Sequence, residues 1–102
     1  MQRVVCTKMV LLQGAVGKYG RLYNGLYEPT EELVNNVSVY RKVGDTNKFI
    51  EYVDGEWWVK STVDRGKAAG WACISIYPPK PLEECRHIFW QVDIERCKGQ
   101  QQ

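Results

Sequence analysis

The sequence has few of the residues on which most catalytic and metal sites depend. Its 102 residues include one histidine, His87, so any Ser/His or Cys/His mechanism would have to use that imidazole. No two of its cysteines form a C-x-x-C pair, the tight spacing that structural zinc sites usually show. No window approaches the ~20 apolar residues of a membrane-spanning helix. The sequence therefore predicts no catalytic residue, no cofactor, no metal and no membrane insertion.

An excess of charge of either sign is also missing. Fourteen Lys and Arg stand against 12 Asp and Glu, which gives a formal net charge of +2. Nucleic-acid binders normally concentrate basic residues on one face, so we do not expect a nucleic-acid partner. The chain is 44% hydrophobic and 25% charged, an ordinary globular composition. We expect one β domain over residues 1–97 and a disordered Gly/Gln tail over residues 98–102.

The four cysteines are Cys6, Cys73, Cys85 and Cys97, and their positions allow three disulfide connectivities among which the sequence does not choose. A zinc site would recruit the last three together with His87, but Cys85 and His87 are too close for the usual spacing. We interpret Cys73 as a small buried hydrophobe and the other cysteines as reduced thiols. This interpretation predicts a cytoplasmic protein.

Hydrophobic residues alternate with a period of two, and Gly, Asn-Gly and Asp-Gly interrupt them at short intervals. This pattern is typical of small all-β domains. We expect a single small domain in which an antiparallel meander forms a barrel or a small sandwich, with at most short helical turns. Such turns are expected at residues 28–34, where Pro29 and two Glu stand near the start, and at residues 82–85.

Tyr19, Tyr23 and Tyr27 recur every four residues, a spacing that suits a helix face and equally a strand face. Three glycines lie among them, and each Gly costs a helix about 1 kcal/mol relative to Ala. We therefore expect no helix here.

The clearest element is a hairpin over residues 48–60 with Asp54-Gly55 as its turn. Asp-Gly suits a type I′ turn, whose two-residue loop fixes the register of the flanking strands. One face then carries the expected core residues Ile50, Tyr52, Trp57 and Val59. The other face carries Phe49, Glu51, Val53, Glu56, Trp58 and Lys60, and Trp58 is its best candidate for a partly exposed ring. Further strands are expected at residues 1–12, 37–42, 70–77 and 87–94, the last with Trp90 in the core.

The abundance of aromatic residues, 12% of the chain, carries the functional expectation. Trp57, Trp71, Trp90 and Tyr52 suffice for a small β core. Trp58, Tyr23, Tyr27 and Tyr40 remain for a surface patch bordered by Arg41, Lys42 and Lys60. Such a patch suits a protein partner, because Tyr, Trp and Arg dominate binding hot spots. We therefore predict a non-enzymatic interaction module. The alternatives are a carbohydrate-binding module that stacks sugars on exposed rings and a small enzyme that uses His87.

Several short motifs follow one another along the chain: Gly14-Ala15, Asn24-Gly25-Leu26-Tyr27, Val39-Tyr40-Arg41-Lys42, Ile50-Glu51-Tyr52, Trp58-Val59-Lys60, Gly70-Trp71-Ala72, Pro79 and Trp90-Gln91-Val92. With them the chain, over about residues 12–92, resembles a small Gly/Trp-rich module of modular proteins from protists and marine invertebrates. The resemblance implies a β-rich accessory module without a settled activity and without catalytic residues to carry over. A lone copy with short flanks indicates an excised domain or a small stand-alone protein.

Overall fold

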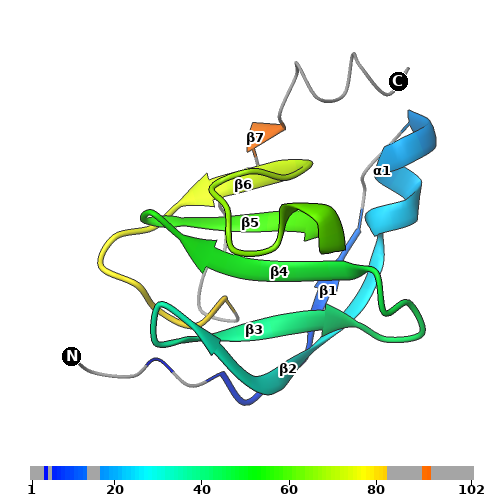
Figure 1. Cartoon of the computed structure of the whole chain (residues 1–102). Coiled ribbons are helices and arrows are strands. Elements are labelled where there is room, and N and C mark those ends of the chain that lie inside the picture. Colours follow the sequence, from blue (N-terminus) through cyan, green and yellow to red (C-terminus); the bar gives the residue numbers. More distant parts are fainter. Residues whose placement is uncertain (1–3, 5, 14–16, 83–90, 93–102) are drawn as a thin grey trace.

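The computed structural model describes residue 4 and residues 6–13, 17–82 and 91–92. Within them, seven strands form one antiparallel sheet whose spatial order follows the chain, and the sheet curls into a half-barrel (Figure 1). The predicted fold class, an antiparallel meander in one small domain with little helix, is confirmed. The elements are β1 (Val10–Leu12), α1 (Gly17–Tyr23), β2 (Gly25–Val34), β3 (Val37–Lys42), β4 (Lys48–Val53), β5 (Glu56–Ser61), η1 (Thr62–Asp64), β6 (Ala72–Ser75) and β7 (Gln91–Val92).

The predicted β4–β5 hairpin is confirmed pair by pair. Tyr52 lies opposite Trp57, Ile50 opposite Val59, and Glu51 opposite Trp58. The turn residues Asp54 and Gly55 have φ values of 53° and 79°, the left-handed conformation that a type I′ turn requires at both positions. Because side chains alternate along a strand, this single turn decides which hairpin residues face the core.

The helical turn expected at residues 28–34 is wrong, because this stretch belongs to β2. Asn35 and Asn36 adopt φ values of 56° and 65° and turn the chain tightly, so that Val34 pairs with Val37 of β3. Asn tolerates this left-handed conformation better than most residues. The register shifts between Pro29 and Leu33, an irregularity that suits a proline without an N–H to donate.

A second correction concerns α1, which the sequence did not predict. Contacts with the sheet satisfy carbonyl groups at the end of this seven-residue helix. Lys42 Nζ donates to the Leu22 carbonyl at 2.7 Å, and the Tyr27 hydroxyl donates to the Tyr23 carbonyl at 2.7 Å. These donors help to offset the cost of glycine in the helix. Among the described residues, no helix combines the length and the apolar character needed to cross a bilayer.

The core fills the concave side of the sheet and is built around Trp57, which is fully buried. Tyr40 and Tyr52 pack edge-on against its ring, with centroid distances of 5.7 and 5.5 Å. The Trp57 indole N–H donates to the Lys80 carbonyl at 3.2 Å, which ties the segment after β6 to the core. The expected core residues Ile50, Tyr52, Trp57 and Val59 are all buried, which confirms that prediction.

Two other expected strands are present only in part. Strand β6 covers Ala72–Ser75 of the expected 70–77, and β1 covers Val10–Leu12 of the expected 1–12. Val4 forms an isolated parallel bridge with Val37. Of the strand expected at residues 87–94, Gln91 and Val92 form β7, whereas Trp90, the turn expected at residues 82–85 beyond Leu82 and the expected tail lie outside the described residues.

Candidate functional site

Three of the tyrosines assigned to a surface patch are buried, which corrects the sequence-based expectation. Tyr27 and Tyr40 lie on the concave face and are fully buried. Tyr23 ends α1, and its ring stacks on Trp71 with centroids 5.1 Å apart and planes 7° from parallel. Lys48 places its ammonium 5.5 Å from the centroid of the same Tyr23 ring. Sequence spacing did not separate these rings from the core, because their burial depends on the unpredicted helix and on the curl of the sheet.

Trp58 occupies the convex face of β5, between Glu51 of β4 and Cys73 of β6. It is half-buried, and its indole N–H has no hydrogen-bond acceptor among the residues that the structure describes. The ring is thus more accessible than that of Trp57, whereas Cys73 beside it is buried.

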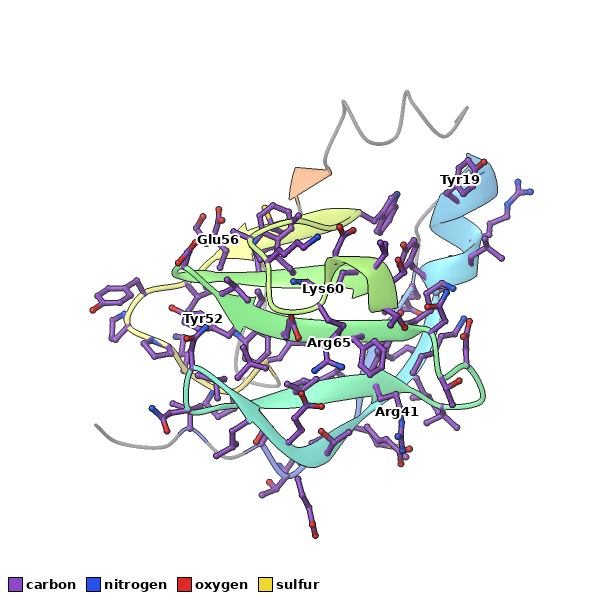
Figure 2. The ribbon with its side chains drawn as sticks, in the orientation of Figure 1. Tyr19, Arg41, Tyr52, Glu56, Lys60 and Arg65 are labelled. Atoms are coloured by element: carbon purple, nitrogen blue, oxygen red, sulfur yellow. The ribbon has the colours of Figure 1, made fainter. Side chains whose placement is uncertain are left out.

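Lys60, also expected at the edge of the patch, lies instead in a buried ionic cluster on the convex face. Its ammonium is 2.8 Å from a carboxylate oxygen of Glu51, and both side chains are 0% exposed. The same ammonium donates to the carbonyls of Asp64 and Lys67, at 3.1 and 2.5 Å. Figure 2 shows Lys60 and Arg65 on this face of the β4–β5 hairpin. The Lys60 ammonium therefore makes its contacts inside the protein and does not border a surface patch.

Arg65 and Gly66 complete the ionic cluster from the loop that follows η1. Arg65 Nε donates to Glu51 at 2.6 Å, the Gly66 N–H donates to Glu51 at 2.5 Å, and the Arg65 guanidinium also pairs with Glu32 of β2. Burial by itself would raise the pKa of Glu51, but these donors outweigh it and hold the pKa below its ordinary value. Burial lowers the pKa of Lys60 despite the adjacent Glu51 carboxylate. The cluster fastens the loop to the sheet.

Arg41 remains on the surface of β3, where its side chain is 45% exposed (Figure 2). Exposed apolar side chains follow on the neighbouring strands. Leu11 of β1 lies opposite Leu26 of β2. The Val43 N–H donates to the Leu26 carbonyl at 2.8 Å, so Val43 stands beside Leu26 on the other side. The three side chains therefore form one cross-strand row on the convex face.

The exposed fractions distinguish this row from the buried positions around it. They are 57% for Leu11, 46% for Leu26 and 45% for Val43, and Met9, directly before β1, is 53% exposed. Along the same face, the next positions of β2 and β3 hold Glu28 and Arg41, which form a loose ion pair at 3.9 Å. We call Met9, Leu11, Leu26 and Val43 the outer apolar surface.

A hollow of about 480 Å³ lies beside the irregularity in β2, between Leu33, Ser38 and Cys6. Two of its polar side chains, Ser38 and Thr30, already have partners in the backbone. Ser38 Oγ accepts from the Cys6 N–H at 2.9 Å, and Thr30 Oγ1 donates to the Val39 carbonyl at 2.8 Å. These hydrogen bonds serve the fold, so the Ser38 and Thr30 hydroxyls are already used within the protein.

The described residues contain no group of three or more His, Cys, Asp and Glu side chains arranged to hold a metal ion. His87, Cys85 and Cys97 lie outside the described residues, so the zinc and enzyme alternatives concern a part of the chain of which nothing is described.

Sequence reasoning missed the outer apolar surface because it assigned function to aromatic residues. The alternation Leu26-Tyr27-Glu28 contains the relevant pattern. Once Tyr27 points into the core, Leu26 and Glu28 must point outward. Comparisons with protein-family models, with curated proteins and with solved structures found no match. The resemblance to a Gly/Trp-rich module therefore stays a prediction.

Proposed function

We propose that this protein is a non-enzymatic interaction module that binds a protein partner through the outer apolar surface, with Arg41 at its border. The observation that carries the proposal is the row of Leu11 on β1, Leu26 on β2 and Val43 directly after β3, whose three side chains are exposed. A single exposed Leu is ordinary on a protein surface, whereas neighbouring exposed apolar side chains mark interaction sites.

The composition of the surface suits a protein partner better than a sugar. Sugars bind by stacking on accessible rings, but the outer apolar surface contains no aromatic side chain, and Tyr23, Tyr27 and Tyr40 are buried. Burial of aliphatic side chains contributes about 25 cal/mol per Å² of apolar area removed from water. The adjacent Arg41 side chain is 45% exposed and belongs to a residue type enriched in binding hot spots. An aliphatic centre with a polar border is the usual anatomy of a protein interface.

The proposal is tested by placing a charge in the centre of the row. Leu26→Asp should abolish binding, because the partner would have to desolvate a carboxylate without a counter-charge. Val63→Asp is the matched control, since Val63 is 68% exposed on η1 and lies outside the outer apolar surface. Proteins captured by the wild-type chain would be identified, purified and titrated against both variants by calorimetry.

Binding of a purified partner that Leu26→Asp abolishes and Val63→Asp preserves supports the proposal. Equal affinities of both variants for every purified partner would refute it. Circular dichroism and thermal unfolding of each variant check that a loss of binding is not a loss of fold. Because position 26 is already half exposed, we expect the fold to tolerate Asp there.

A further inference from the structure

Strand β1 exposes backbone hydrogen-bonding groups at an edge of the sheet. In an antiparallel pair, opposite residues alternate between hydrogen-bonded and non-hydrogen-bonded positions, and the N–H and C=O of one residue point to the same side. The Leu26 carbonyl accepts from Val43, so the backbone groups of Leu26 point toward β3. Leu11, directly opposite Leu26, therefore occupies a non-hydrogen-bonded position. Its N–H and C=O point away from β2.

On the side toward which these groups point, no strand of the described residues pairs with β1. Strand β1 is the first strand in the order β1 to β7, and within the described chain it pairs only with β2. Protein edges that must stay unpaired usually carry a charged residue or a proline at the outward position. Here the outward side chain is Leu11, at the end of the apolar row. The edge thus combines accessible backbone groups with an apolar side chain.

The charge of this segment indicates what kind of strand would pair with it. Residues 6–13 contain one charged side chain, Lys8, which is exposed, and no acidic residue. Arg41 is also exposed, but it belongs to β3 and pairs with Glu28 of β2, so Lys8 is the exposed charge of this segment itself. An added strand with alternating apolar and acidic residues would continue the row beyond Leu11 and place carboxylates near Lys8. The charge favours such a strand over a basic one.

We propose that the partner binds by strand addition: an extended acidic and apolar segment of another protein pairs with β1 through the N–H and C=O of Leu11. The inference rests on the proposed function and adds the binding mode and the chemistry of the partner. Backbone hydrogen bonds would supply register, and an apolar side chain packed beside Leu11 would supply specificity.

The experiment uses the full chain labelled with ¹⁵N and a capped peptide of alternating Val and Glu. The peptide should shift the amide signals of residues 9–13 saturably and slow hydrogen exchange of the Leu11 amide. Two control peptides separate the contributions. One is N-methylated at alternate residues, which removes backbone donors, and the other has Lys in place of Glu. Each should bind about tenfold more weakly or worse, as expected for the loss of one or two net hydrogen bonds or of favourable charge.

A matched pair of protein variants tests the same edge by changing Leu11 of β1 instead of the peptide. Leu11→Pro removes the N–H that points away from β2, so strand addition should be lost while the pairing of β1 with β2 is kept. Leu11→Val keeps the N–H and an apolar side chain and should bind within about threefold of wild type. Thermal unfolding confirms that both variants fold. If Leu11→Pro does not fold, the N-methylated peptide on the wild-type chain decides the question.

Three outcomes would overturn strand addition. The first is a Leu11 amide that is already protected from exchange in the free protein, because another segment or a second copy would then occupy the edge. The second is an N-methylated peptide that binds as tightly as its parent, because only side chains would then make contact. The third is the absence of amide shifts with the Val/Glu peptide at ~1 mM, a concentration that detects weak binding. The protein-binding proposal fails separately, by equal binding of Leu26→Asp and Val63→Asp to a purified partner.

Discussion

Replacement of Lys60 by Met should destabilise the protein strongly, although the two side chains are similar in length. The Lys60 ammonium lies 2.8 Å from Glu51 and also donates to two loop carbonyls. Met leaves those carbonyls without this donor and leaves Glu51 with only Arg65 and the Gly66 N–H. Removal of one partner from a buried ion pair costs about 3–5 kcal/mol. A domain of this size has a total stability of about 5–15 kcal/mol, so the expected loss is a large part of it.

Urea unfolding followed by tryptophan fluorescence measures this loss, and the melting temperature should fall by about 4–8 °C per kcal/mol. Lys67→Met is the matched control. Its side chain is exposed in the same loop, so we expect a change within about 0.5 kcal/mol. The double variant Lys60→Met/Glu51→Gln should cost less than the sum of the single variants, because the two groups interact directly. A loss below about 1 kcal/mol in Lys60→Met would refute the buried ion pair.

Two more predictions concern backbone packing and pH. Gly70→Ala should destabilise the fold by about 1–3 kcal/mol in urea unfolding, because an added Cβ at this buried position would lie 2.5 Å from the Val59 carbonyl oxygen. Ala68→Gly, at an exposed position two residues earlier, should cost less. The folded pKa of Glu51 is below its unfolded value, so its contribution to stability is complete above the unfolded pKa and is lost as pH falls through the folded pKa. The free energy of unfolding, measured by urea titration between neutral and acid pH, should therefore fall less steeply in Glu51→Gln, and equal slopes would contradict this assignment.

The sequence predicted the hairpin correctly because its determinants are local. The Asp54-Gly55 pair selects the turn, the turn fixes the register, and strict alternation then places Tyr52 and Trp57 in the core. The prediction of a helical turn at residues 28–34 failed because two local signals compete there. Pro29 and the adjacent Glu residues favour a helix start, whereas Asn35-Asn36 forms a turn that pairs β2 with β3, and that pairing prevails.

Tertiary structure alone decided which rings and charges reach the surface. Tyr23 is buried because Trp71, 48 positions later in the chain, stacks on it, and no local pattern encodes that contact. Lys60 is buried because the loop with Arg65 and Gly66 folds over the convex face, where the register predicted only a mixed polar surface. Alternation along a strand determines to which face a side chain points. Whether that face meets water depends on what packs against it, and that is why the outer apolar surface became recognisable only in the folded sheet.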